Sequence, residues 1–318
     1  MKLTSRIRDD LIWWKENIIY SFNPILGPNF ITEIFSDASL SGWGASCKEE
    51  KTHGFWNNEE RQYHINYLEL RAAFFGLKCF ARKFRNCDIL LRIDNTTAIS
   101  YINRMDGIQF EHLSSMTKKI WSWCEHRNIW IFASYIPSKD NTVADEESRK
   151  LEPETEFSLS QKAFDHLCTT FGRPDIDLFA SRINNKYPNY VFWKQDPGSI
   201  AIDAFTIEWN DSFFYAFPPF TLIPKVLKKI INDNARGILV VPYWPSQAWF
   251  PSACRCSNQN LLFLNLNLVF CVPPIGILIH YGTNFPWWNL IEQVYQQKNM
   301  TPEAIRISIA SLSDSSLR

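Results

Sequence analysis

Four acidic residues constrain this chain more than any other feature of its sequence: Asp37, Glu69, Asp94 and Asp145. Their local contexts are FSDASLSGWGA (35–45), YLELRAAFFGL (67–77), LRIDNTTAI (91–99) and NTVADEESR (141–149). In chain order these contexts predict a strand, a helix, a strand end and a second helix. A fold that brings all four together would hold a cluster of carboxylate oxygens.

Such a cluster has a specific chemistry. Mg²⁺ takes oxygen ligands, and nucleases often hold two ions with a shared set of Asp and Glu side chains. The four acids therefore predict a site where carboxylates hold hard cations. A site of this kind is typical of enzymes that cut phosphodiester bonds. The alternative is four ordinary surface acids among the 33 Asp and Glu of the chain. The flanking residues favour the metal site, because the small residues after Asp37 would allow backbone and phosphate to approach closely.

The order of the expected elements favours an α/β fold with a mixed five-stranded sheet. Residues 31–36, 42–45 and 52–56 read as three strands of an antiparallel meander, with a charged turn at 48–51. The later strands need helical crossovers and therefore predict parallel pairing. The remaining expected elements are a helix at 67–84, a strand at 88–93, helices at 96–104 and 110–127, a strand at 129–136 and a helix at 142–150.

A chain of 318 residues is long enough for two domains. We expect a second α/β domain, with a helix near 222–233 and a buried strand at 237–241. The expected organisation is a lead-in segment at 1–30 with a short helix around 9–19, a first domain at 31–150, an acidic linker at 151–160, a second domain at 161–295 and a tail at 296–318.

Composition limits the classes of partner and compartment. The formal net charge is zero, whereas a free-standing nucleic-acid binder is usually basic. The eight Cys form no C-x-x-C motif, which disfavours zinc and favours free thiols. The apolar stretch at 257–282 is interrupted by Asn and Pro, so we expect two short buried strands joined by a turn and no transmembrane segment. Without a signal peptide, the expected localisation is nuclear or cytoplasmic.

The first 150 residues resemble ribonuclease H of type 1. The order of the four acids matches, and HINYLELRAA (64–73) and YIPSKDNTVADEESR (135–149) resemble the ribonuclease H of DIRS-type retrotransposons, which integrate with a tyrosine recombinase. The resemblance implies hydrolysis of the RNA strand of an RNA–DNA hybrid with two Mg²⁺ or Mn²⁺ ions. The implied metal ligands and catalytic residues are Asp37, Glu69, Asp94 and Asp145.

The same resemblance implies four residues that meet the substrate: Ser39, Asn66, Asn141 and Tyr135. Asn66 matches an amide that touches the hybrid in its minor groove, where the 2′-OH marks RNA. Asn66 and Asn141 could each equally cap a helix. Tyr135 departs from the family, which places a mobile His there. Because a Tyr hydroxyl has a pKa near 10, we expect slowed turnover.

Some members of the family insert a basic helical handle that grips the hybrid. In this chain the handle would fall between Arg104 and Phe110, where only a short turn is expected. The grip on the hybrid would then come from elsewhere. The basic run at 78–85 and a reverse transcriptase polymerase partner are the two candidates.

The expected second domain at 161–295 contains, in order, DIDLFASRINNKYPNY (175–190), DAFTIEWN (203–210), YAFPPF (215–220) and GILVVPYWPSQAWF (237–250). These segments resemble the region that follows ribonuclease H in DIRS-type elements, which is related to adenine-N6 DNA methyltransferases. The motif that binds the target base starts there with a polar residue, whereas this chain has Phe217-Pro218-Pro219-Phe220. Phe217 cannot accept the hydrogen bond that this motif needs. We therefore expect a methyltransferase-like fold kept for packing. Residues 296–318 resemble the start of the adjoining recombinase.

Three functions follow from these observations. The first is a ribonuclease H from a retroelement polyprotein. The second is a catalytically weak or inactive remnant that binds nucleic acid or serves as a scaffold. The third is a DNA methyltransferase, which Phe217 opposes.

Overall fold

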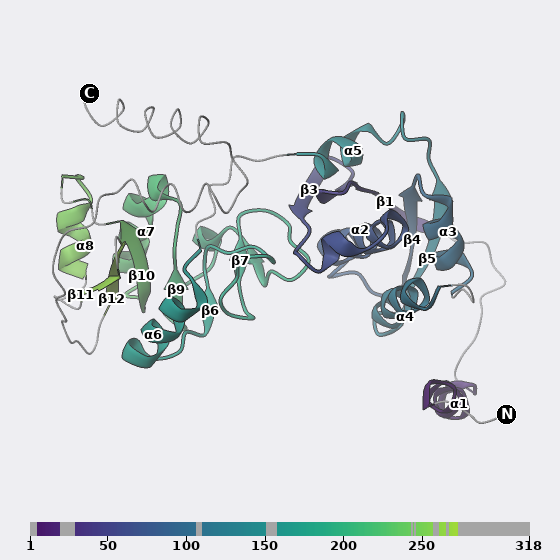
Figure 1. Cartoon of the computed structure of the whole chain (residues 1–318), viewed down its shortest axis with the longest axis horizontal. Helices are drawn as coiled ribbons and strands as arrows, with labels where there is room; N and C mark the ends of the chain where they lie inside the picture. The colour runs from purple at the N-terminus through teal and green to yellow at the C-terminus, as the bar shows by residue number, and fades with distance from the viewer. Residues whose placement is uncertain are drawn as a thin grey trace. The chain divides into compact units, whose positions relative to one another are not determined.

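The computed structural model describes residues 5–19, 29–105, 110–150, 158–242, 244, 246–256, 261–264 and 267–272 (Figure 1). Contacts within the chain divide it into two compact units. The first consists of Met1–Lys51 with Gln62–Ser148, and the second of Thr52–Arg61 with Arg149–Arg318. The functional domain limits expected from the sequence stay predictions, and most of the expected linker and all of the tail at 296–318 lie outside the described residues.

The first unit is built on a mixed five-stranded sheet, as the sequence predicted. Its strands are β1 (Phe30–Ala38), β2 (Gly42–Cys47), β3 (Glu50–Phe55), β4 (Cys87–Ile93) and β5 (Ile129–Tyr135), in the order β3-β2-β1-β4-β5. Strand β1 is antiparallel to β2 and parallel to β4, which is in turn parallel to β5. The parallel half places the ends of β1, β4 and β5 at one edge of the sheet.

The turn between β2 and β3 is shorter than the expected turn at 48–51. It contains only Lys48 and Glu49, and β3 already begins at Glu50. Lys48 has a φ of 56°, in the left-handed region that suits a two-residue hairpin turn. The expected turn was too long because all four charged residues were assigned to it, whereas Glu50 and Lys51 belong to strand β3.

Helices complete the first unit: α1 (Ser5–Asn17), α2 (Ile65–Phe80), α3 (Thr96–Asn103), α4 (Glu111–Glu125) and α5 (Thr142–Ser148). The 3-10 turn η1 (Glu60–Gln62) begins in the segment that belongs to the second unit. Helix α1 begins four residues earlier than expected, since nothing in 5–8 interrupts it. Helix α2 buries an almost complete apolar face against β1, β2 and α4. It ends at Phe80 rather than 84, where the N–H of Ala81 donates to the carbonyl of Leu77.

The second unit contains another five-stranded sheet, in the order β11-β12-β10-β9-β6. Strands β6, β9 and β10 are parallel, and β12 is antiparallel to both β10 and β11. Its elements are α6 (Gln161–Phe171), β6 (Ile176–Asp177), β7 (Val191–Phe192), β8 (Ala201–Ile202), η2 (Ala204–Thr206), β9 (Phe213–Ala216), η3 (Phe220–Leu222), α7 (Ile223–Asn232), β10 (Arg236–Pro242), α8 (Phe250–Cys256), β11 (Leu261–Leu264) and β12 (Asn267–Val272).

Several expectations for this half can be compared with the structure. Helix α7 and strand β10 lie where the sequence predicted a helix and a buried strand. The apolar stretch contains two antiparallel strands, β11 and β12, and its residues from 273 onward are outside the described part. A likeness of this half to methyltransferases stays a prediction. No helix among the described residues has both the length and the apolar character needed to cross a bilayer.

Residues 52–61, which include most of β3, belong to the second unit and are joined to the later part of the chain by a buried ion pair. Arg182 places Nη1 2.8 Å from Oε1 of Glu60 and Nη2 2.9 Å from Oε2, and Nη2 also donates to the carbonyl of Phe55 at 2.7 Å. Glu60 is only 3% exposed. Thr52 adds a hydrogen bond to the carbonyl of Gln195. A buried carboxylate held by a bidentate guanidinium is costly to separate from its partner.

Gly44 lets helix α5 lie directly on the backbone of β2. A Cβ atom at this position would be 2.2 Å from the carbonyl oxygen of Ala144 and 2.5 Å from the nitrogen of Ser148. Both atoms belong to backbone and cannot move aside without displacing α5. Because Gly44 is paired with Asp37 across the sheet, this close approach also fixes the surroundings of the first acid.

We expect Gly44→Ala to lower the free energy of unfolding by about 1–3 kcal/mol, since the added methyl forces α5 off the sheet. Urea denaturation followed by circular dichroism measures the change. Gly76→Ala is the matched control, because its methyl would meet only side-chain carbons, at 3.1 and 3.3 Å. Equal stability of the Gly44→Ala variant and the wild type would contradict this account of α5 packing.

Candidate active site

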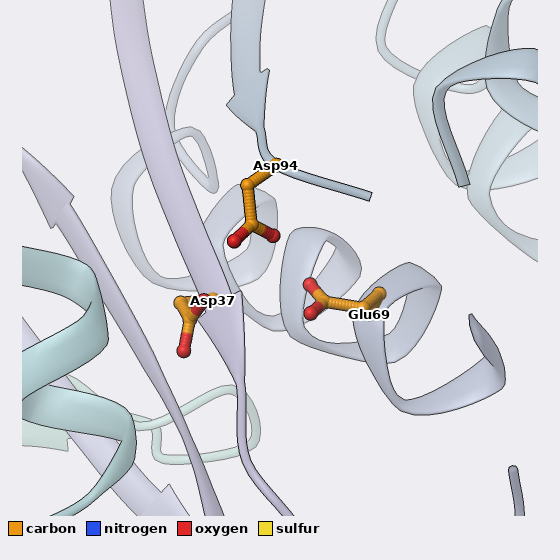
Figure 2. A group of neighbouring side chains, drawn as sticks. All are labelled: Asp37, Glu69 and Asp94. Carbon is orange, nitrogen blue, oxygen red and sulfur yellow. The ribbon is translucent and has the colours of Figure 1, made fainter. Parts of the chain in front are cut away.

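The structure brings three of the four predicted acids together. Ligand oxygens of Asp37, Glu69 and Asp94 all lie within 4.8 Å of one another. Figure 2 shows their origin: Asp37 lies on β1, Asp94 follows the end of β4, and Glu69 projects from α2. The parallel register pairs Phe35 with Arg92, so Asp37 and Asp94 are neighbours two residues further along. The expected convergence of two strand ends and a helix is therefore present.

Burial sets the electrostatics of this group. Asp37 and Glu69 are each 4% exposed, and Asp94 is half-buried. Burial and, to a lesser extent, the charges of Asp37 and Asp94 together raise the pKa of Glu69 to about 9, although a hydrogen bond from the backbone of Ala38 opposes this rise. Without a bound cation, Glu69 is therefore protonated at neutral pH.

One oxygen of the group has no hydrogen-bond partner among the residues that the structure describes. Oε2 of Glu69 is buried and makes no hydrogen bond. A buried oxygen of this kind is unfavourable unless a ligand satisfies it. Together with two neighbouring carboxylates it forms a hard, all-oxygen donor set, which fits Mg²⁺ or Mn²⁺. The residues present thus fit a divalent cation.

Two serines that the sequence did not single out hold the aspartates. The hydroxyl of Ser148 donates to Oδ2 of Asp37 at 2.6 Å, and that of Ser138 donates to Oδ2 of Asp94 at 2.6 Å. Both serines lie within the segment 135–149 that carries the family resemblance. The spacing gives no sign of which acid each one meets, because these contacts span 111 and 44 residues.

The fourth acid, Asp145, is not in the group of three. It lies half-buried in the first turn of α5, which packs against β1 and β2. Its backbone carbonyl accepts from the hydroxyl of Ser148, and its N–H donates to the carbonyl of Asn141. Its role as a metal ligand stays a prediction.

Asn66 lies inside α2 and is not its N-cap. The N-cap is His64, whose Nδ1 accepts from the N–H of Asn66 at 3.2 Å, so a structural role for this histidine is supported. The side-chain oxygen of Asn66 accepts from Nδ2 of Asn95 at 2.9 Å. Asn95 directly follows Asp94 and caps α3 through the N–H of Ala98. A hydrogen bond thus ties the start of α2 to the end of β4.

Asn141 and Ser39 make structural contacts in this chain. Nδ2 of Asn141 donates to the carbonyl of Ser36 at 3.1 Å, while its Oδ1 is buried and meets no hydrogen-bond donor from the described segments. The hydroxyl of Ser39 donates to the carbonyl of Ser148 at 2.6 Å and accepts from the N–H of Gly42. These bonds join the turn after β1 to α5. The expected substrate contacts of both residues stay predictions.

Tyr135 ends strand β5 beside the group. It is paired with Ile93, the residue before Asp94, and its side chain is 54% exposed. The position is therefore adjacent to the acids and open to solvent. Residues 106–109, where a basic handle would fall, lie outside the described part of the chain.

Comparison with known proteins gives fold likenesses only at low similarity. No protein-family model matches the chain, and no curated protein matches it. RNase H1 from the archaeon Halobacterium salinarum NRC-1 is 16% identical at a TM-score of 0.31, over 36% of this chain and 92% of that one. LC11-RNase H1, solved with an RNA/DNA hybrid, is 17% identical at 0.30, over 36% and 92%.

A third solved structure is the foamy viral protease-reverse transcriptase in complex with an RNA/DNA hybrid. It is 12% identical at a TM-score of 0.29, over 47% of this chain and 27% of that one. At identities and TM-scores this low, the function of this chain has to be argued from the site itself.

The raised pKa of Glu69 makes the stability of the metal-free protein depend on pH. The folded protein keeps a proton on Glu69 that the unfolded chain releases above pH 4.5. The free energy of unfolding should therefore fall as pH rises from 4.5 toward about 9. Glu69→Gln should flatten this slope, which urea denaturation in EDTA across that range would measure.

Glu125→Gln, at an exposed position in α4, is the control and should keep the slope of the wild type. Added Mg²⁺ should stabilise the wild type more at the upper end of the range, because the cation replaces the proton. A slope that Glu69→Gln leaves unchanged would contradict the assignment.

Proposed function

We propose that this chain is a metal-dependent endonuclease that hydrolyses the RNA strand of RNA–DNA hybrids. The observation that carries the proposal is the group of Asp37, Glu69 and Asp94, with ligand oxygens within 4.8 Å and one buried oxygen of Glu69 left without a partner. Three converging carboxylates, two of them buried, are an unfavourable arrangement unless they bind cations.

The residues of the site have distinct roles in this proposal. Asp37, Glu69 and Asp94 hold two Mg²⁺ or Mn²⁺ ions, with Asp145 as a fourth ligand. When bound, these ions activate the attacking water and stabilise the leaving 3′ oxygen. Ser148 and Ser138 fix the aspartate carboxylates through their 2.6 Å hydrogen bonds, so the ligand oxygens need little reorganisation.

Recognition of RNA is proposed for the amide of Asn66. It lies one turn before Glu69 on α2 and is held by Asn95, which follows Asp94. An amide in this place can bond the 2′-OH that distinguishes RNA from DNA in the minor groove. The chain would then act within a retroelement polyprotein, with a reverse transcriptase polymerase domain as partner.

Asp94→Asn should abolish cleavage while leaving the fold intact, because the amide cannot replace a charged metal ligand. The assay is cleavage of a labelled RNA–DNA hybrid in Mg²⁺ and, separately, in Mn²⁺. Asp88→Asn, at the other end of β4, is the matched control and should cleave like the wild type. Full activity in the Asp94→Asn variant would overturn the metal-site assignment.

Tyr135→His should raise the rate of cleavage, since a His titrates near neutral pH and can transfer protons beside Asp94. General acid–base groups typically contribute roughly 10²–10⁴-fold, and a gain toward the lower end is expected. Tyr135→Phe is the control and should leave the rate unchanged. A loss of activity in Tyr135→Phe, with no gain in Tyr135→His, would show that the tyrosine hydroxyl itself is used.

The rival function is a retroelement remnant that binds nucleic acid or a partner without cutting. The neutral net charge and Tyr135 favour it, whereas the intact group of acids opposes it. Calorimetry distinguishes the two: a nuclease site should bind Mg²⁺ and lose this binding in Asp94→Asn. The absence of cleavage by both wild type and Tyr135→His would decide for the remnant.

A further inference from the structure

Helices α2 and α4 of the first unit lie side by side (Figure 1). Their residues line an open depression in the surface with a volume of about 720 Å³. Its lining is strongly basic. The charged and imidazole side chains in the lining are Lys78, Lys118, Lys119, His126, Arg127 and a single acid, Glu111. Because the whole chain balances 33 Lys and Arg with 33 Asp and Glu, this concentration of positive charge is local. We call it the basic cavity; none of its residues belongs to the group of acids.

Aromatic rings hold two of these cations in place. Nζ of Lys78 lies 4.3 Å from the ring centre of Phe74, and the guanidinium carbon of Arg127 lies 4.0 Å from that of Trp123. The two rings pack edge to face at 6.1 Å. Cations held over aromatic faces are already ordered and therefore lose less conformational freedom when an anion binds.

Arg127 lies in an electrostatically unfavourable position. Its Nη1 donates to the carbonyl of Trp123, but its Nε is buried and has no hydrogen-bond partner in the described part of the chain. Burial lowers the pKa of Arg127, and repulsion from Arg85 and Arg82 lowers it further. These two arginines lie on the turn that follows α2, so the positive field extends past the cavity. A bound anion would relieve this repulsion.

We propose that the basic cavity binds the sugar–phosphate backbone of a nucleic acid strand. Guanidinium and ammonium groups are the usual phosphate ligands, and the planar fork of Arg127 matches two phosphate oxygens. Helix α2 carries Glu69 nine residues before Lys78, a distance of about 14 Å along its axis. A helical strand covers that distance in about four nucleotides, at 3.4 Å each.

We identify the bound anion as nucleic acid because of the proposed function. The basic cavity could bind a nucleic acid strand even if the protein does not cleave it. The strand bound in the basic cavity is then a part of the substrate that does not contact Asp37, Glu69 or Asp94. An acidic polypeptide is the other anion that such a cavity would attract, and the experiment separates the two.

The test is binding of a fluorescent RNA–DNA hybrid to the full chain in EDTA, measured by anisotropy over a series of salt concentrations. The double variant Lys118→Glu/Lys119→Glu should weaken binding at least about tenfold. Loss of two phosphate contacts should reduce the slope of log K against log salt by about 1.8. The matched control, Lys162→Glu/Lys228→Glu, makes the same change in net charge at exposed positions of α6 and α7 and should bind almost like the wild type.

Two results would overturn the proposal. One is an equal loss of hybrid affinity in both double variants, which would show that only the net charge of the protein matters. The other is competition by polyglutamate that equals competition by DNA of the same charge. In cleavage assays the Lys118→Glu/Lys119→Glu variant should raise KM and keep kcat. If the wild type binds as described but never cuts, the proposed nuclease function fails and the binding site stands.

Discussion

Mutual repulsion among Asp37, Glu69 and Asp94 is the constraint around which the first unit is organised. Two of the three side chains are almost fully buried, where charges interact more strongly than in water. The protein alone limits the repulsion by leaving a proton on Glu69. The same arrangement becomes favourable when cations enter, so the site is better suited to the metal-bound state than to the empty one.

The surrounding fold resists the separation of these groups. Strands β1 and β4 are adjacent and parallel, which fixes the spacing of Asp37 and Asp94, while α2 brings Glu69 across the sheet. Ser148 extends this control to α5, because one residue bonds both Asp37 and Ser39. The last helix of the unit is thereby tied to the first strand, although more than 100 residues separate them.

Sequence patterns predicted the parts of this fold that depend on local chemistry. Alternation and helical periodicity located most elements of the first sheet, and Asp94 at a strand end followed directly from them. The contacts of Ser138, Ser148 and Asn95 could not be predicted, because each depends on packing between distant segments. The limits of the charged turn at Lys48 were also wrong, since a positive φ at a non-glycine residue has no reliable signature in sequence.

The contacts of residues 52–61 limit where the chain can be cut into separate fragments. They lie between β2 and α2 in sequence, yet they cluster with the later chain through Glu60 and Arg182. A recombinant fragment ending near residue 150 would contain the acidic group but would lack Arg182, the bidentate partner of Glu60. A division of the protein that keeps the contacts of residues 52–61 therefore includes more than the continuous segment that encodes the acids.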